Sequence, residues 1–168
     1  MTRTADVDFL WCPEPVPDEV PVVQVYGWLV DDAGRVLVQD TGNRFNLPGG
    51  SPEPFDADLG ATVAREAMEE SQVTATDVGY LGYERVLRAG RPQALVRTVG
   101  RISEFHPRQP DPDGDRLFRR LMTSFAEAPG LLRWGPSGVA QAQAAARIAQ
   151  RCWGVPVESP ALPASYVD

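Results

Sequence analysis

Two apolar stretches near the start of the chain predict a β-hairpin. They cover residues 22–30 and 35–39, and the intervening DDAG supplies Asp and Gly, which favour a turn. The next segment, TGNRFNLPGGSPEPFD, has the Gly, Pro and Asn content of a long loop. Further along, VGYLGYERVLRAG and QALVRTVGRISEF predict two more strands, joined by the turn RAGRP. A second Pro- and Asp-rich loop, HPRQPDPDGD, follows them.

Helical spacing of apolar residues predicts a helix over about residues 58–70, with Asp56 or Asp58 as its N-cap. Its apolar stripe consists of Leu59, Val63, Ala64, Ala67 and Met68. A short helix is also expected over residues 116–123.

The segment WGPSGVAQAQAAARIAQRCWG predicts a C-terminal helix, with Ser137 as N-cap and Gly154 just past its end. Strands, a helix, more strands and a final helix indicate one α/β domain with a mixed sheet between helices. We expect this single domain, residues 1–168, to have three parts: an N-terminal extension (1–21), a core (22–155) and a loosely held tail (156–168).

The charge balance is acidic, with a formal net charge of −7, and the positive charges come from arginine alone. Without a basic run, general binding to nucleic acid is not expected. The chain has no apolar run long enough to span a bilayer, and its N-terminus lacks the apolar segment of a signal peptide. We therefore expect a cytoplasmic protein that does not bind membranes, and the sequence allows a homodimer. Cys12 and Cys152 are far apart, so neither a disulfide framework nor a zinc site is expected.

Three glutamates on the predicted helix at 58–70 are candidates for chemistry. Glu66, Glu69 and Glu70 stand at i, i+3 and i+4, which places their carboxylates on one helix face. Like charges at this spacing cost roughly 0.2–0.5 kcal/mol per pair, and the adjacent Arg65 cannot neutralise all three. Mg²⁺, which prefers oxygen ligands, would offset the repulsion. Taken alone, EAMEE is more typical of a solvated helix face, but the Leu-Pro-Gly-Gly loop and the Arg-Glu pair favour a metal site.

Residues 50–73 resemble the signature of the Nudix hydrolases. In that signature a Gly, five residues, a Glu and seven residues precede Arg-Glu-U-x-Glu-Glu-x-Gly-U, where U is apolar. The positions that match here are Gly49, Gly50, Arg65, Glu66, Glu69, Glu70 and Val73. The resemblance extends over roughly residues 22–105 and implies a Nudix-like α/β/α sandwich with a mixed sheet between helices.

The chain departs from the signature at two places. Counting forward from Gly50 puts Asp56 in the slot of the first Glu, whereas counting back from Arg65 puts Ala57 there, so the loop is one residue longer. The Gly slot after the paired glutamates holds Gln72. If the helix ends there in a left-handed turn, Gln carries a penalty of roughly 1 kcal/mol that Gly avoids.

The resemblance implies hydrolysis of a phosphoanhydride bond in a nucleoside diphosphate linked to another moiety, with Mg²⁺ or Mn²⁺ as cofactor. Glu66, Glu69 and Glu70 would bind the metal, with the Gly49 carbonyl as a further ligand. Arg65, Glu66 and Glu69 are the candidate catalytic residues, with Arg65 holding the glutamates in place. The two departures motivate an alternative, a nucleotide sensor of the same fold that binds without turnover.

The general base stays open at this point, because the resemblance allows a signature glutamate or a carboxylate of a later loop. The candidates are Glu66, Glu69, Glu104, Asp111, Asp113 and Asp115. For the three aspartates, a turn-rich loop is the simpler interpretation. His106 is likewise expected to be a loop residue rather than a catalyst.

Aromatic side chains offer candidates for a nucleobase pocket. We expect Tyr26, Phe45 or Tyr83 to line it. Three of the four tryptophans are expected in the core instead: Trp28, Trp134 and Trp153.

Overall fold

The structure, a computed structural model, describes residues 9–168, and the beginning of the expected N-terminal extension (1–8) lies outside the described residues. Its strands are β1 Leu10–Cys12, β2 Val22–Val30, β3 Val36–Asp40, β4 Phe45–Asn46, β5 Gly49–Gly50, β6 Val73–Arg88, β7 Arg91–Phe105, β8 Arg119–Thr123 and β9 Ser165–Val167. Its helices are α1 Leu59–Ser71, α2 Ala128–Leu132 and α3 Gly135–Trp153.

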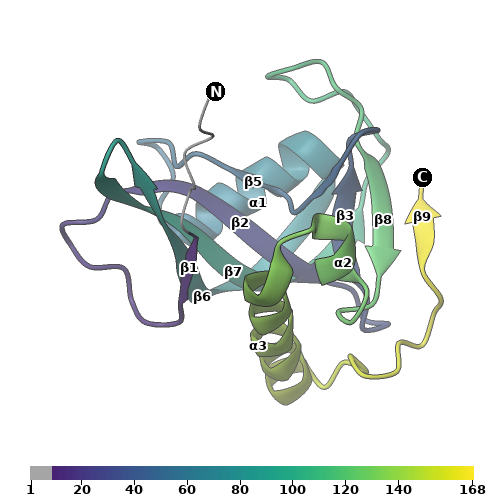
Figure 1. Cartoon of the computed structure of the whole chain (residues 1–168). Helices are drawn as coiled ribbons and strands as arrows, with labels where there is room; N and C mark the ends of the chain where they lie inside the picture. The colour runs from purple at the N-terminus through teal and green to yellow at the C-terminus, as the bar shows by residue number, and fades with distance from the viewer. Residues whose placement is uncertain (1–8) are drawn as a thin grey trace, which may run out of the picture.

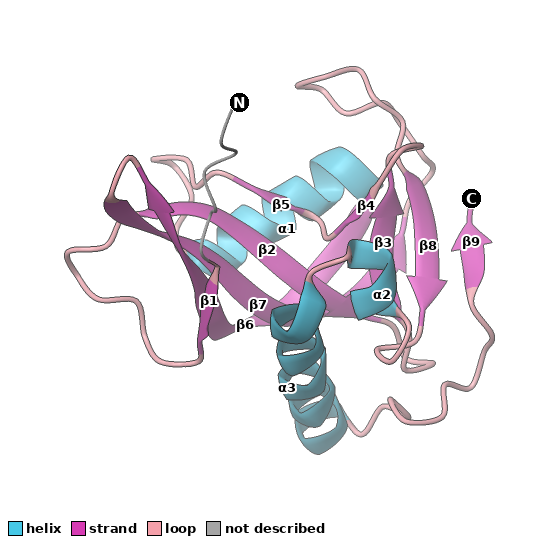
Figure 2. Cartoon of the chain, in the orientation of Figure 1, coloured by secondary structure: helices cyan, strands magenta, loops and turns pink. Residues whose placement is uncertain are grey.

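All strands belong to one mixed sheet. The strand order is β1-β6-β7-β2-β3-β8-β9, while β4 pairs with β3 and β5 with β2. Strands β2 and β7 run parallel, and the other pairs are antiparallel. Helix α1 covers one face of the sheet, and α3 lies on the other (Figures 1 and 2). The predicted α/β fold with a mixed sheet between helices is confirmed.

The alternation of side chains along β2 creates a hydrophobic core on each face of the sheet. Val25 and Leu29 pack with Val63 of α1, whereas Trp28 and Val30 point to the opposite face, as the period of two in a strand requires. On that second face, α3 contributes small buried side chains: Ala142, Ala145 and Ala149. Helix α1 therefore packs directly against β2, the strand that also pairs with β5.

Several local predictions are confirmed. The hairpin of β2 and β3 turns at residues 31–34, where the Asp31 carboxylate accepts hydrogen bonds from the backbone N–H groups of Ala33 and Arg35. Asp58 is the N-cap of α1. Gly154, with φ of +65°, ends α3 in the left-handed conformation that favours glycine.

The helix predicted over 116–123 is wrong, because Arg119–Thr123 forms strand β8. The backbone of β8 pairs along its length with β3, from Val36 to Asp40. Side chains of Arg120 and Met122 point into the protein. Pairing with a distant strand outweighed the local helical pattern, as tertiary context commonly does.

The C-terminal region differs from expectation at three points. Helix α2, which includes Pro129, was not predicted from the sequence. Trp134 rather than Ser137 is the N-cap residue of α3, and the Ser137 hydroxyl contacts Glu84 instead. The tail, expected to be loosely held, contributes β9, which pairs with β8 at the edge of the sheet.

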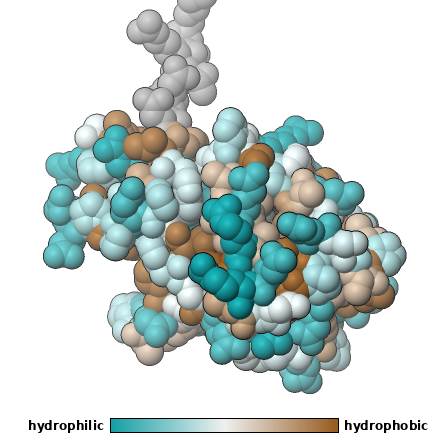
Figure 3. All heavy atoms as spheres, turned by 90° about the horizontal axis from the view of Figure 1, so that it is seen from below, coloured by the Kyte–Doolittle hydropathy of each residue, from teal (hydrophilic) through white to brown (hydrophobic). Residues whose placement is uncertain are grey.

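The surface is mixed in polarity. On the face shown in Figure 3, hydrophilic residues alternate with small apolar areas, and among the described residues no apolar area extends across that face. No helix within residues 9–168 combines the length and the apolar character that crossing a membrane requires.

Candidate active site

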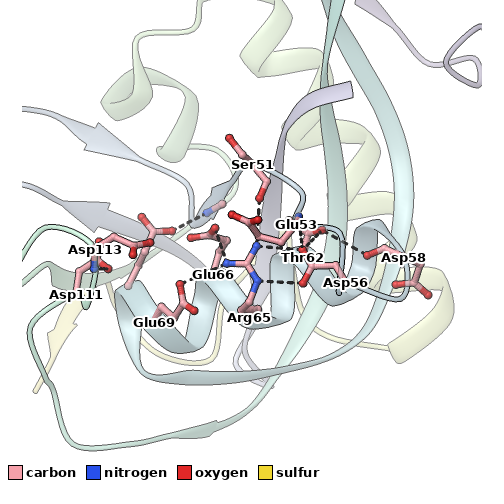
Figure 4. A network of polar contacts seen from close by, with 12 residues as sticks. Ser51, Glu53, Asp56, Asp58, Thr62, Arg65, Glu66, Glu69, Asp111 and Asp113 are labelled. Atoms are coloured by element: carbon pink, nitrogen blue, oxygen red, sulfur yellow. Dashed lines mark hydrogen bonds and ion pairs between the residues drawn. The ribbon is translucent and has the colours of Figure 1, made fainter. Parts of the chain in front are cut away.

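Helix α1 carries the candidate residues, and its start is set by Asp58. The Asp58 carboxylate accepts a hydrogen bond of 2.8 Å from the Ala61 backbone N–H, which satisfies one of the free donors of the first helical turn. Glu66 and Glu69 lie on the side of the helix that faces the loop before it, residues 51–58 (Figure 4). Glu66 and Glu69 both lie close to Arg65, whereas Glu70 points towards Gly49 of β5.

The glycines of β5 bring backbone against these carboxylates. The Gly49 N–H donates a hydrogen bond of 2.9 Å to Glu70 Oε1, so the loop and the helix are tied together. A Cβ at Gly50 would collide with the Glu66 carboxylate, and one at Gly49 would collide with the Val25 carbonyl. Glycine is therefore required at Gly49, where the collision is with backbone, whereas at Gly50 a Cβ would displace the Glu66 carboxylate from its position.

Arg65 connects the loop to the helix. It binds Asp56 in a bidentate manner, with Nε and Nη2 each 3.0 Å from a carboxylate oxygen. Asp56 also accepts hydrogen bonds from the Thr62 hydroxyl and the Glu53 N–H, both at 2.9 Å. The structure thus assigns the slot of the first signature Glu to Asp56, while Ala57 is exposed.

The same guanidinium reaches the glutamates. Arg65 Nη1 lies 2.9 Å from Glu66 Oε1 and 3.4 Å from Glu69 Oε2, while Nη2 donates to the Ser51 carbonyl at 3.1 Å. The bidentate bond to Arg65 holds the pKa of Asp56 well below its usual range, and that of Arg65 is raised in turn. Arg65 therefore stays paired and orients two of the three glutamates, whereas Glu70 receives no bond from it.

Two of the three glutamates, Glu66 and Glu70, have pKa values above the ordinary value for a glutamate. Burial raises the pKa of Glu70 to about 8, although the Gly49 N–H counters it, and the charge of Glu66 raises it further. Burial also raises the pKa of Glu66, with Arg65 acting in the opposite direction. A cation at this face would relieve both effects.

Two loop aspartates lie near the face. Figure 4 shows Asp111 and Asp113 on the side of α1 that carries Glu66 and Glu69. Their charges contribute to the raised pKa values of Glu70 and Glu66 respectively. The other candidate bases are placed differently.

Glu104 is mostly exposed, and its carboxylate lies 3.9 Å from His106 Nε2. The His106 ring also contacts the Thr74 hydroxyl at 2.8 Å, so it serves to hold the loop. Asp115 is exposed at the end of the loop turn, where its N–H donates to the Asp111 carbonyl.

Comparison with known proteins identifies the family to which the chain belongs. A family model described as the NUDIX domain matches residues 20–143. The chain belongs to the Nudix hydrolase family. Comparison with curated proteins gives no matching relative. Membership supports pyrophosphate hydrolysis as the general reaction.

Solved Nudix structures share the fold at low identity. A NUDIX hydrolase from Nitrosomonas europaea is 18% identical, with a TM-score of 0.57 over 74% of this chain and 87% of the other. MutT, from work on the Aliivibrio salmonicida and Vibrio cholerae proteins, is 13% identical, with a TM-score of 0.53 over 74% and 96%. The E. coli ORF135 protein is 21% identical, with a TM-score of 0.52 over 82% and 96%.

The residues of the Nudix helix fit a divalent cation in their chemistry. They offer hard carboxylate oxygens, which Mg²⁺ and Mn²⁺ prefer, and the half-buried Glu70 forms no ion pair with a basic side chain of the described residues. Gly50 leaves a space against Glu66 that any Cβ would fill. Within residues 9–168, however, no three His, Cys, Asp or Glu side chains already converge as a metal-binding group.

A cavity of about 930 Å³ lies beside β4, the strand that precedes the Gly49–Gly50 loop. Two of the aromatic candidates, Tyr26 and Phe45, line it, and Tyr26 is the sheet partner of Gly49. Tyr83, the third aromatic candidate, belongs to a hydrophobic core cluster and is not one of the residues that line the cavity. Trp134, expected in the core, also lines the cavity.

The remaining tryptophans are not cavity residues. Trp28 is fully buried in the core, as expected. Trp153 packs against the same core and is partly buried, with the Arg101 guanidinium 5.8 Å from its ring.

A buried polar cluster at the base of the cavity was not predicted from the sequence. The Arg97 guanidinium lies 4.9 Å from the Tyr26 ring and 4.6 Å from the Trp134 ring, and Arg97 Nε donates to Gln141 at 3.0 Å. Gln141 in turn donates to Glu84 at 2.7 Å. A charged residue in the apolar centre of a predicted strand was the available signal, since isolated charges are rarely buried without a partner.

Proposed function

We propose that this protein hydrolyses a phosphoanhydride bond in a nucleoside diphosphate linked to another moiety, with Mg²⁺ or Mn²⁺ as cofactor. The observation that carries the proposal is the arrangement of two carboxylates against the Gly49–Gly50 loop: Glu66 is buried beside Gly50, and the half-buried Glu70 accepts a hydrogen bond from the Gly49 N–H. Family membership supports the same general reaction.

In this proposal Glu66, Glu69 and Glu70 hold the cation, and the Gly49 carbonyl is a further ligand. A bound divalent cation would neutralise the phosphate oxygens and make water easier to deprotonate. Arg65 keeps Glu66 and Glu69 in place through the ion pairs described above. Because the chain carries a net charge of −7, the cation is also needed to offset repulsion of an anionic substrate.

The general base is a carboxylate that the chain supplies close to the cation. Glu66 or Glu69 fills this role from the helix, and Asp111 or Asp113 from the loop. The adjacent cavity, with Tyr26, Phe45 and Trp134 on its walls, is suited to a planar nucleobase, because aromatic rings stack on such rings. Because Tyr26, on its wall, is the sheet partner of Gly49, the position of the cavity supports a nucleotide rather than a simple pyrophosphate as substrate.

The test is hydrolysis of a panel of nucleotide sugars, ADP-ribose, dinucleoside polyphosphates and oxidised nucleoside triphosphates with Mg²⁺. We expect turnover of at least one class that EDTA abolishes. Glu69→Gln and Glu70→Gln should each lower kcat/KM by roughly 100-fold or more, because each removes charge from the cation site. Glu158→Gln, at an exposed glutamate of the C-terminal segment, is the matched control and should match the wild type.

The alternative is a nucleotide sensor without turnover. It is favoured by the finding that no three metal-binding side chains converge within residues 9–168. Tight binding of panel members without any product would support it, and full activity of both glutamine variants would rule out the metal assignment.

A further inference from the structure

The residue that ends the Nudix helix departs from the family signature and makes unusual contacts. Gln72 stands in the glycine slot, and its backbone adopts the left-handed conformation, with φ of +49° and ψ of +48°. Its side chain does not extend into solvent, because the residue is only 5% exposed. A non-glycine residue here costs roughly 1 kcal/mol in backbone strain, so another interaction must offset it.

The Gln72 side chain connects the helix to the following acidic loop (residues 106–118). Its Nε2 donates to the Glu69 carbonyl at 2.9 Å, and its Oε1 accepts a hydrogen bond from the Gln109 N–H, also at 2.9 Å. The Gln72 carbonyl accepts another from the His106 N–H at 2.8 Å. Glycine at this position would keep only the backbone contact, so the bond to Gln109 depends on the glutamine.

Beyond Gln109, the acidic loop forms a turn that is held by hydrogen bonds between its own residues. The Asp111 N–H donates to the Arg116 carbonyl at 2.6 Å, and the Asp115 N–H donates to the Asp111 carbonyl at 2.7 Å. The Asp113 N–H donates to the Asp111 carboxylate at 3.0 Å. Fixing Gln109, two positions before Asp111, therefore fixes the placement of the turn that carries Asp111 and Asp113.

This turn lies over the Nudix face. Figure 4 shows Asp111 and Asp113 on the side of α1 occupied by Glu66 and Glu69. Carboxylates placed near a cation site strengthen cation binding through space, even where they do not coordinate the ion.

We propose that Gln72 is a positioning residue, which anchors the acidic loop over the Nudix helix so that Asp111 and Asp113 increase the affinity of the site for a divalent cation. The inference rests on the proposed function, since it concerns the same cation site. If Gln72 served only as a helix cap, replacing it with glycine would leave the affinity for a divalent cation unchanged or improve it, because glycine caps the helix better than glutamine.

The decisive variant is therefore Gln72→Gly. We expect its thermal stability to be equal to or above that of the wild type, its Mn²⁺ affinity to fall roughly tenfold, and backbone amides of residues 106–117 to exchange faster in metal-free protein. Excess Mn²⁺ should restore kcat. Ala89→Gly is the matched control, since it also places glycine at a left-handed position, with φ of +50°, in an exposed turn.

A double-mutant cycle tests whether Gln72 changes the cation affinity through the aspartates of the acidic loop. If Gln72 acts through the loop, Gln72→Gly combined with the double variant Asp111→Asn and Asp113→Asn should bind Mn²⁺ no more weakly than that double variant alone. Electron paramagnetic resonance of free Mn²⁺ measures the affinity without turnover. Gln72→Met, which keeps the volume but cannot accept the Gln109 bond, should lose affinity as Gln72→Gly does.

Failure of this inference can be distinguished from failure of the proposed function. Wild-type Mn²⁺ affinity in Gln72→Gly, or unchanged exchange in the loop, overturns this inference and leaves the proposed function intact. If the wild type neither binds Mn²⁺ nor turns over any substrate of the panel, the proposed function fails and this inference fails with it.

Discussion

At the scale of single residues, Arg65 does most to organise the site. Its guanidinium has five donors in a planar fork, and the structure uses this fork to bind Asp56, Glu66, Glu69 and the Ser51 carbonyl. The one-residue extension of the loop is accommodated because Asp56 still meets Arg65, although its side chain is one methylene shorter than the Glu of the signature.

Arg65→Lys should lower kcat/KM by roughly tenfold or more while keeping the charge, because lysine cannot form the bidentate bond to Asp56. Steady-state kinetics on the best substrate of the panel, together with thermal unfolding, measures the effect. Arg101→Lys is the control, since Arg101 pairs with Asp32 on the exposed surface. Unchanged kcat/KM in Arg65→Lys would show that the fork is dispensable.

A second residue-scale feature is the buried carboxylate of Glu84 below the cavity. Glu84 is 3% exposed, and burial raises its pKa above the ordinary value of 4.5, although Arg97 and Gln141 act in the opposite direction. Its contribution to stability is therefore complete below pH 4.5 and is lost as the pH rises through the folded-state pKa.

Glu84→Gln removes this titration. We expect the free energy of unfolding of the wild type to fall, relative to that of Glu84→Gln, as the pH rises from 5 towards 8. Urea unfolding of both proteins at several pH values measures this difference, in which other titrating groups cancel. Parallel stability curves for the two proteins would contradict the assigned direction of the pKa shift.

At the scale of elements, α1 is specified at both ends by polar side chains. Asp58 satisfies a free N–H at the start, and Gln72 binds the Glu69 carbonyl at the end. Between them, Val63 and Ala67 pack against the sheet, and Glu66 and Glu70 lie against Gly50 and Gly49 of β5. The short strand β8 is held differently, since its backbone bonds depend wholly on β3 and β9.

Asp58→Ala should lower the free energy of unfolding by about 1 kcal/mol, the usual cost of losing an N-cap side chain. Urea denaturation measures it, with Asp32→Ala as the control at an exposed turn position whose ion pair is worth little. A loss equal to that of the control would mean that the cap bond does not stabilise the helix.

At the scale of the whole molecule, Arg120 joins segments that are far apart in the chain. Its Nη1 donates to the Ser71 carbonyl at 3.2 Å and to the His106 carbonyl at 2.7 Å, and its Nε donates to the Val167 carbonyl at 3.1 Å. The end of the Nudix helix, the acidic loop and the C-terminal strand thus share one buried guanidinium.

Arg120→Met should therefore lower the free energy of unfolding by about 3 kcal/mol, because several buried carbonyls lose a charged donor. It should also increase hydrogen exchange in both the acidic loop and β9. Arg147→Met, at an exposed position on α3, is the matched control. A change confined to β9 would show that the three segments are not coupled through Arg120.

Local signals in the sequence were enough for much of the fold and for the helical half of the site. The hairpin turn at residues 31–34, the Asp58 cap and the Glu66, Glu69 and Glu70 spacing all depend on residues a few positions apart. Interactions of this range act in the same way wherever the segment is placed, so a pattern can predict them.

By itself, then, the sequence determined the α/β order of elements, the acidic face of the Nudix helix and its glycine loop. Only the tertiary structure decided that residues 119–123 form a strand, that Asp56 rather than Ala57 meets Arg65, and that Trp134 lines a cavity. The physical reason is the same in each case. These outcomes depend on partners distant in the chain or on the path of a loop, and no local pattern encodes the position of such partners.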